Sequence, residues 1–235
     1  MYSNTEKKTK NQYNTNKMSV QSNLLNIRKH IPDNVDLVCV SKFHPNDSIL
    51  DAYHAGERIF GESKVQELCS KYETLPKDIQ WHFIGHLQSN KVKYIVPFVE
   101  LIHGVDSIKL LSEIDKQAAK VGRKVNCLLQ VHIAAEETKF GFSPEEITTA
   151  LEEARGFENV QITGLMGMAT FTDNTEQVKN EFRLLKSIFD ELKSHADSEF
   201  TILSMGMSDD FRLAIEEGST MIRIGSSIFG NRNYV

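Results

Sequence analysis

The chain has 235 residues, of which 40% are hydrophobic and 25% are charged, enough to bury the core of one domain. Its formal net charge of -5 and its pI near 5.9 argue against a nucleic-acid-binding surface. No apolar stretch approaches the ~20 residues that span a bilayer, and no apolar signal region follows the start. We therefore expect a cytoplasmic protein that binds neither nucleic acid nor membranes.

The composition along the chain predicts its domain organisation. Residues 1–17 are rich in Asn, Lys and Thr, which indicates a disordered segment or one added artificially. No linker interrupts residues 18–235, so we expect a single domain there. Cys39, Cys69 and Cys127 are odd in number and scattered, which favours reduced thiols over disulfides and shows no metal-ligand spacing.

Eight runs rich in β-forming residues alternate with helical patterns from residue 36 onward. The runs cover residues 37–42, 58–61, 81–85, 99–105, 125–132, 160–169, 201–207 and 221–229. Between them lie apolar stripes with helical spacing. One contains Leu111 and Ile114 and ends at Gly122, and another contains Phe182 and Leu185.

This alternation predicts parallel βα units. Eight such units in about 200 residues leave no room for a second domain. We predict a single (β/α)8 TIM barrel, at the short end of the usual ~250 residues. An open doubly wound sheet is the alternative, but the glycine-rich fingerprint expected after its first strand does not follow Lys42. Ser143 and Pro144, followed by two glutamates, indicate a helix start.

Lys42 is the first candidate for chemistry, because it closes the apolar run 37–42 and turn residues follow at once. An ammonium with an apolar wall behind it is partly desolvated, which lowers its pKa and makes the free amine a nucleophile for carbonyls. The structural alternative is a lysine that extends from a strand end into water. The rest of the chain has to decide between these interpretations.

Two glycine- and serine-containing loops follow the seventh and eighth predicted strands, where such barrels often hold phosphate. Ser204 and Gly206 belong to the first loop, and Gly225 and Ser226 to the second. Glycines let backbone N–H groups approach an anion, and serine hydroxyls add donors. Tight turns with serine caps are the structural alternative, but two such loops at these two places favour a phosphate site.

Arg223 lies inside the eighth predicted strand, where an arginine is costly to bury without a partner. An ion pair with a carboxylate is one interpretation. The other sets its guanidinium against the ring nitrogen of a bound pyridine. A lysine that forms an aldimine, a phosphate site and a partner for the pyridine nitrogen are the points by which proteins hold pyridoxal phosphate.

Three histidines, His82, His103 and His132, fall in the third, fourth and fifth predicted strands, so a metal site has to be considered. The first strand carries no histidine, unlike the metal-binding barrel hydrolases, whose first strand has a His-x-His pair. We therefore expect structural histidines whose hydrogen bonds are satisfied.

Six ordered motifs then resemble the pyridoxal phosphate homeostasis protein family, whose barrel is similar to the N-terminal domain of alanine racemase. They cover the chain from about residue 20 to its end. The motifs are Val40-Ser41-Lys42 with Pro45; Phe60-Gly61-Glu62 with Val65-Gln66-Glu67; residues 81–91; Gly164-Leu165-Met166; residues 203–208; and Arg223-Ile224-Gly225 with Ile228-Phe229-Gly230.

By this resemblance Lys42 would carry the aldimine and Arg223 would face the ring nitrogen. Met166 would pack near the ring. The phosphate would be held by Ser204, Gly206, Gly225 and Ser226. The chain departs from the family at Ser63, where an asparagine is usual, which puts any cofactor contact of that asparagine in doubt.

We expect a protein that carries pyridoxal 5'-phosphate on Lys42 and buffers it or delivers it to pyridoxal phosphate-dependent apoenzymes, without strong catalytic activity. A racemase that uses the same cofactor, and an aldolase whose lysine attacks its substrate directly, are the alternatives. Racemisation needs acid/base groups on both faces of the cofactor. In the racemases that this family resembles, a tyrosine supplies the second of these groups. Of the six tyrosines here, only Tyr234 lies just beyond a predicted strand end.

Overall fold

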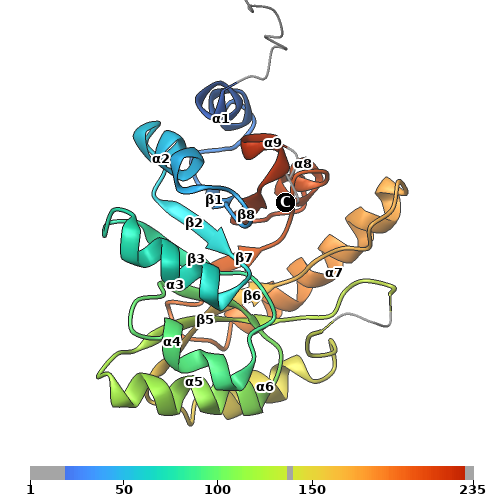
Figure 1. Cartoon of the computed structure of the whole chain (residues 1–235). Helices are drawn as coiled ribbons and strands as arrows, with labels where there is room; N and C mark the ends of the chain where they lie inside the picture. The colour runs from blue at the N-terminus through green and yellow to red at the C-terminus, as the bar shows by residue number, and fades with distance from the viewer. Residues whose placement is uncertain (1–18, 137–139, 231–235) are drawn as a thin grey trace, which may run out of the picture.

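The computed structural model describes residues 19–136 and 140–230. The predicted segment 1–17 and Tyr234 lie outside the described residues. Eight parallel strands close into a barrel in chain order (Figure 1), which confirms the predicted (β/α)8 TIM barrel. The strands are β1 (Asp36–Val40), β2 (Ile59–Glu62), β3 (Gln80–Phe83), β4 (Leu101–Val105), β5 (Val125–Gln130), β6 (Val160–Met166), β7 (Ile202–Ser204) and β8 (Met221–Ile224).

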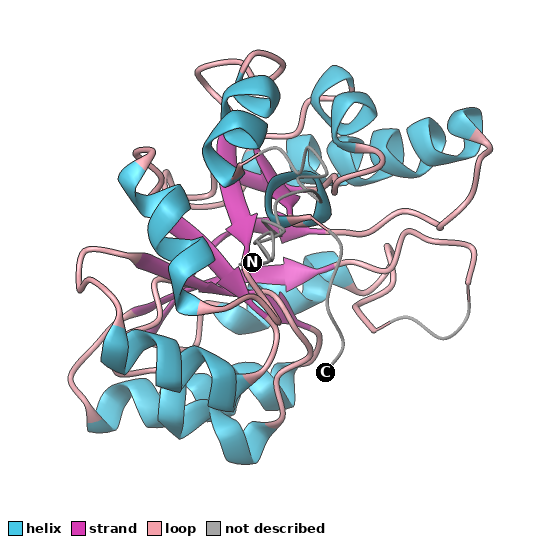
Figure 2. Ribbon diagram, turned by 45° about the horizontal axis from the view of Figure 1, so that its top comes forward, coloured by secondary structure: helices cyan, strands magenta, loops and turns pink. Residues whose placement is uncertain are grey.

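Helices surround this barrel on the outside (Figure 2). They are α1 (Val20–Arg28), α2 (Asn46–His54), α3 (Val65–Thr74), the 3-10 helix η1 (Ser89–Lys91), α4 (Val92–Ile95), α5 (Ile108–Lys120), α6 (Ile147–Ala154), α7 (Thr175–Lys193), α8 (Phe211–Glu216) and α9 (Ser226–Phe229). The predicted stripes are confirmed, since α5 buries Leu111 and Ile114 and α7 buries Phe182 and Leu185.

Alternate residues of each strand face different cores, as the two-residue period of a strand requires. Leu37 and Cys39 of β1 belong to the larger core, which lies between the barrel wall and the helices, whereas Val38 belongs to a smaller one. The smaller core lies inside the barrel, and its members are Val38, Leu101, Leu128, Met166 and Met221. A residue two positions from one of these along a strand therefore also points into the barrel.

The last predicted strand was too long. It was expected to continue to Phe229, but β8 ends at Ile224 and the short helix α9 begins at Ser226. Gly225 separates the two with φ -120° and ψ -75°. The apolar pair Ile228 and Phe229 is buried from a helix and not from a strand, because a short apolar run has the same pattern in both.

The expected start of α6 was also early. Ser143 N donates to Glu146 Oε2 at 2.9 Å, and Glu146 N donates to Ser143 Oγ at 3.3 Å, which is a reciprocal capping arrangement. These residues form a turn, and the helix itself begins at Ile147. The predicted fifth strand was also too long, because β5 ends at Gln130 and His132 lies two residues beyond it.

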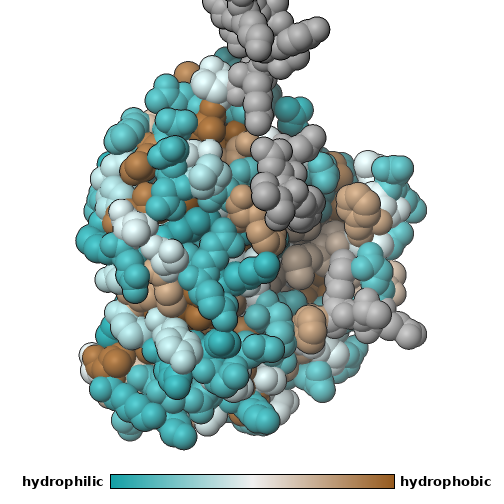
Figure 3. Space-filling model, in the orientation of Figure 1, coloured by the Kyte–Doolittle hydropathy of each residue, from teal (hydrophilic) through white to brown (hydrophobic). Residues whose placement is uncertain are grey.

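The face shown in Figure 3 is mostly hydrophilic, with hydrophobic side chains in small separate groups. Within the part of the chain that the structure describes, Phe171 is the most exposed large hydrophobic residue, at 89%. Across residues 19–136 and 140–230, no helix combines the length and the apolar character needed to cross a membrane.

Candidate functional site

Lys42 lies in a tight turn just after β1. His44 N donates to Ser41 O at 3.1 Å, which closes a four-residue turn with Lys42 and Phe43 at its centre. Phe43 has φ 67°, the left-handed region that costs a non-glycine residue about 1–3 kcal/mol. The ring of His44 stacks on Phe229 of α9, with centroids 5.0 Å apart. The turn that carries Lys42 is therefore held in a strained conformation against neighbouring elements.

A buried charged network supports the residue before Lys42. Lys71 Nζ of α3 donates to Glu62 Oε1 at 2.8 Å and to the Ser41 carbonyl oxygen at 2.9 Å. Ser41 Oγ donates to Glu62 Oε1 at 2.6 Å. Burial raises the pKa of the Glu62 carboxyl, although the Lys71 ammonium and the Ser41 hydroxyl act in the opposite direction. Glu62 Oε2 is buried and has no hydrogen-bond partner.

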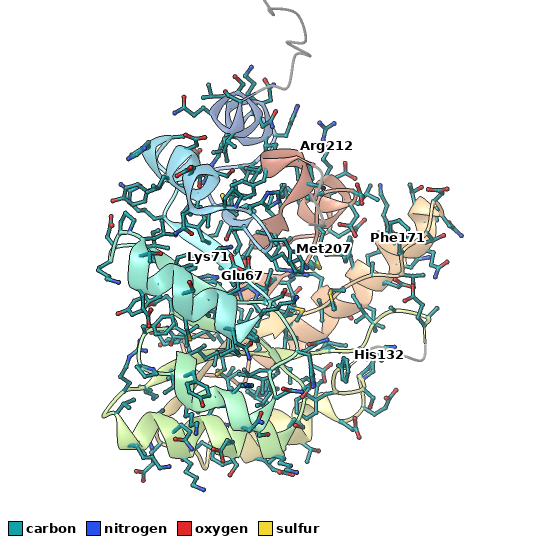
Figure 4. The ribbon with its side chains drawn as sticks, in the orientation of Figure 1. Glu67, Lys71, His132, Phe171, Met207 and Arg212 are labelled. Carbon is teal, nitrogen blue, oxygen red and sulfur yellow. The ribbon has the colours of Figure 1, made fainter. Side chains whose placement is uncertain are left out.

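The same lysine also supports the residue after Lys42. Lys71 Nζ donates a third hydrogen bond to Glu67 Oε1 at 2.7 Å, so all three ammonium hydrogens are used. Glu67 Oε1 accepts a hydrogen bond from Phe43 N at 2.7 Å. Figure 4 shows Glu67 and Lys71 together on α3 beside the barrel. Both peptide groups that flank Lys42 are thus tied, directly or through one carboxylate, to Lys71.

Arg223 of β8 points into the barrel, two residues after Met221 of the interior core. It is buried at 4% exposure and forms no ion pair with a described residue. Its hydrogen bonds go to neutral oxygens: Nη1 donates to Ser204 Oγ at 2.6 Å and to Ser204 O at 3.0 Å, and Nη2 donates to Gly167 O at 3.2 Å. Burial lowers its pKa to about 10, with Asp210 acting in the opposite direction, so Arg223 remains a cation at neutral pH.

Ser204 lies beneath this arginine and not in the loop above it. Its hydroxyl is fully buried and contacts both Arg223 Nη1 and, at 3.1 Å, His103 Nδ1. His103 Nε2 in turn lies 3.0 Å from His82 Nδ1. Both histidines are buried and hydrogen-bonded, as expected from the sequence, and within the described residues no group of three or more His, Cys, Asp or Glu side chains could hold a metal.

The two predicted phosphate loops meet at the carboxyl end of β7 and β8. Gly206 has φ 96°, and a Cβ there would lie 2.5 Å from Ala214 Cβ, so only glycine fits this turn. Ser208 Oγ accepts a hydrogen bond from Gly225 N at 3.3 Å, which joins the two loops. Ser226 begins α9 and is exposed. Gly206 and Gly225 therefore lie in adjoining loops, as the sequence predicted, whereas Ser226 is the first residue of the helix that follows. Ser208 belongs to the first of these loops.

Met166 lies at the end of β6 and is buried in the interior core at 2% exposure. Ser63, the departure from the family pattern, follows β2 and is partly exposed. A Cβ at Gly85 would lie 2.4 Å from Ser63 O, so glycine lets this loop approach the end of β3. Met166 and Ser63 come from strands on different sides of the barrel.

A cavity of about 570 Å³ opens between the loops that follow β6 and β7. Its lining includes Phe171, Val178, Met207 and Asp210 but neither Lys42 nor Arg223. Figure 4 shows Met207 near the barrel mouth and Phe171 farther out, towards α7. Met207 N donates to Asp210 Oδ1 at 2.5 Å, and burial raises the pKa of the Asp210 carboxyl. This cavity is separate from the group of residues around Lys42.

Reasoning from the sequence missed the residues that hold the site from behind. Lys71 occupies the buried face of α3, three residues after Leu68 and six after Val65. The sequence did carry a signal for it, because a lysine in an apolar stripe follows a glutamate, Glu62, at the end of the preceding strand. His103 and Ser204 had no such signal, because their contact joins β4 to β7 across the barrel.

Comparisons with known proteins agree with this geometry. Residues 16–233 match the family model described as alanine racemase, N-terminal domain. The pyridoxal phosphate homeostasis protein of Aquifex aeolicus is 43% identical over 199 residues, which cover 84% of this chain and 87% of that protein.

Two solved structures of PipY from Synechococcus elongatus PCC7942 are also similar. The structure without PLP has a TM-score of 0.86 and 37% identity, and the structure with PLP bound has a TM-score of 0.82 and 36% identity. Each comparison covers 90% of this chain and 100% of PipY. With its closed barrel, its lysine turn after β1 and its buried arginine on β8, this chain belongs to the alanine racemase N-terminal domain family and, within it, to the pyridoxal phosphate homeostasis proteins.

Proposed function

We propose that this protein binds pyridoxal 5'-phosphate covalently at Lys42 and buffers the cofactor inside the cell. The observation that carries the proposal is the order of three adjoining strands. β7 and β8 bear the Gly206 and Gly225 loops and Arg223, and β1, which pairs with β8, leads directly to Lys42. An amine, a buried cation that has no ion-pair partner among the described residues, and two glycine loops suited to an anion thus lie on adjoining strands.

The residues present fit this cofactor. When bound, pyridoxal phosphate supplies an aldehyde for a lysine amine and a pyridine ring that can withdraw electrons. Arg223 forms no ion pair with a described residue, and its hydrogen bonds to described residues use Nη1 and Nη2 but not Nε. Its unused N–H groups suit a neutral acceptor such as a pyridine nitrogen. A carboxylate at this place would suit a protonated ring nitrogen instead.

The phosphate is bound, in this proposal, by the loops after β7 and β8. Gly206, Gly225 and Ser226, with Ser208 beside them, supply backbone N–H groups and hydroxyls. Ser204 has another role, because its buried hydroxyl already contacts Arg223 and His103. It positions Arg223, while Met166 in the interior core packs beneath the ring.

Carriage is favoured over turnover by the character of Arg223. Its pKa of about 10 keeps it protonated at neutral pH, so it would donate a hydrogen bond to the ring nitrogen of a bound cofactor and leave that nitrogen unprotonated. The ring is then a weaker electron sink. We infer release of the cofactor to pyridoxal phosphate-dependent apoenzymes in the cytoplasm, a compartment in which the free thiols of Cys39, Cys69 and Cys127 stay reduced.

Reduction of the loaded protein with borohydride tests the proposal. The purified protein, incubated with pyridoxal phosphate, is reduced, digested and analysed by mass spectrometry. We expect the reduced adduct on the peptide that contains Lys42, and none in Lys42→Ala. Lys116→Ala removes an exposed lysine from α5 and should leave the yield unchanged. An adduct of full yield on another lysine, or no adduct at all, would refute the proposal.

A further inference from the structure

Four buried polar side chains form one hydrogen-bonded chain across the inside of the barrel. It runs from Arg223 on β8 to Ser204 on β7 at 2.6 Å, then to His103 on β4 at 3.1 Å and to His82 on β3 at 3.0 Å. Each of the four is at most 4% exposed. Buried polar groups in such number require a reason, because each is costly unless its hydrogen bonds are complete.

Only one placement of the hydrogens along these four side chains is consistent with all of their contacts. Arg223 only donates, so Ser204 Oγ accepts from Nη1 and its own hydrogen is left for His103 Nδ1. His103 must then carry its hydrogen on Nε2, which donates to His82 Nδ1. The reverse order would make Ser204 Oγ accept twice, and no other described residue offers an acceptor for its hydrogen.

Both histidines are neutral in this arrangement. Burial lowers the pKa of His82 to about 3. Burial lowers the pKa of His103 well below its usual value, and its electrostatic interactions with His82 and Arg223 act in the same direction. Arg223 is therefore the only cation among these four hydrogen-bonded residues, and none of the four is a carboxylate that could neutralise it.

This order also fixes the guanidinium. The two hydrogens of Nη1 are used by Ser204 Oγ and Ser204 O, and one of Nη2 by Gly167 O. One hydrogen on Nη2 and the one on Nε remain for a ligand. We propose that His103, supported by His82, is a positioning residue that acts through Ser204 to aim Arg223 at the ring nitrogen of the cofactor, an inference that rests on the proposed function.

The proton order can be measured without any cofactor. In 15N NMR spectra of the histidines at pH 7, we expect His103 and His82 to carry hydrogen on Nε2 and none on Nδ1. Ser204→Ala should shift the His103 Nδ1 resonance, because its hydrogen-bond donor is gone. A charged ring, or hydrogen on Nδ1 of His103, would overturn the inference.

Binding of two cofactors separates positioning from a general structural role. 1-Deazapyridoxal phosphate lacks the ring nitrogen, so it cannot accept a hydrogen bond from Arg223. We expect the wild type to prefer pyridoxal phosphate by about 10-fold or more, the value of one hydrogen bond to a charged group. His103→Leu should remove most of this preference, whereas His103→Asn, whose amide oxygen can replace Nδ1 as acceptor, should retain it.

The controls make each outcome decisive. His30→Asn changes an exposed histidine and should match the wild type. If His103→Leu does not fold, Ser204→Ala breaks the same chain with a smaller change and should lose the same preference. Equal weakening of both cofactors in these variants would show a merely structural role and overturn the inference. Failure of the wild type to bind either cofactor would instead refute the proposed function.

Discussion

Lys71 Nζ donates a hydrogen bond of 2.9 Å to the carbonyl oxygen of Ser41, the residue that precedes Lys42. Both residues are buried, although one lies on a helix and the other at the end of a strand. The bond holds the peptide group from which Lys42 leaves the barrel wall. The Glu67 carboxylate extends this support to Phe43 on the other side of the lysine.

Loss of Lys71 should destabilise the protein strongly. Lys71→Met leaves Glu62 buried without its cation, which costs about 3–5 kcal/mol for a buried ion pair. Urea unfolding measures this change. The double variant Glu62→Leu with Lys71→Met should recover part of the loss, because no buried charge is left uncompensated. Lys186→Met breaks a surface ion pair with Asp190 within α7 as a control and should have little effect. A cost for Lys71→Met no larger than for Lys186→Met would contradict this interpretation.

Lys42→Ala should abolish covalent attachment of the cofactor while the barrel stays folded. The Lys42 side chain is partly exposed and lies in a turn, so its truncation removes little buried surface. Absorbance after borohydride reduction reports attachment, and circular dichroism with thermal unfolding reports the fold. The prediction fails if the variant retains a reduced adduct at the yield of the wild type.

The loops and the buried serine should differ in their preference for vitamers. Ser226→Ala should weaken pyridoxal phosphate more than pyridoxal, by about 1.5–3 kcal/mol if the hydroxyl bonds the charged phosphate. Ser204→Ala should weaken both vitamers alike, because its effect passes through Arg223 to the ring. Titration of each variant with both vitamers decides the matter. A phosphate-selective loss in Ser204→Ala would return that hydroxyl to the phosphate site, as first predicted from the sequence.

The loaded protein should exchange the α-hydrogen of L- or D-alanine slowly or not at all. In the proposed site a protonated Arg223 would leave the ring nitrogen without a proton, so the ring would withdraw electrons weakly. Isotope exchange in deuterated water is the assay. Turnover near the median enzyme rate of about 10 per second would contradict carriage and support the racemase alternative. Tyr234, the candidate for a second acid/base group, lies outside the described residues.

Stability should fall in acid because of the buried histidines. The folded pKa of His82 is about 3, below the unfolded value near 6.5, so the unfolded state binds more protons as the pH falls below 6.5. The contribution of His82 to the free energy of unfolding is complete above pH 6.5 and falls by about 1.4 kcal/mol per pH unit towards pH 3. The free energy of unfolding, measured with urea between pH 6 and pH 4, should depend less steeply on pH in His82→Asn than in the wild type. An unchanged slope, with His30→Asn as control, would show that His82 is charged in the folded protein.

Much of the architecture could be predicted from local patterns. Alternating β-rich runs and helical stripes such as the one on α5 are short-range features, and they were enough to predict the barrel and its eight strands. Lys42 at the end of an apolar run, Arg223 in a buried strand and the glycines of the two loops were also visible. Their positions depend on which strand carries them, and strand order in such a barrel follows the order of the chain.

Contacts between distant strands and helices depended on the tertiary structure alone. Ser204 precedes a glycine loop, and only barrel closure brings its hydroxyl to Arg223 and His103 and away from that loop. Lys71 reaches Ser41 because α3 packs against the outside of the barrel wall. The residues that follow Gly225 form a helix because that backbone turns there, although their apolar pattern suited a strand equally well. Side-chain direction and long-range partners arise from packing, which a local pattern of residue types does not contain.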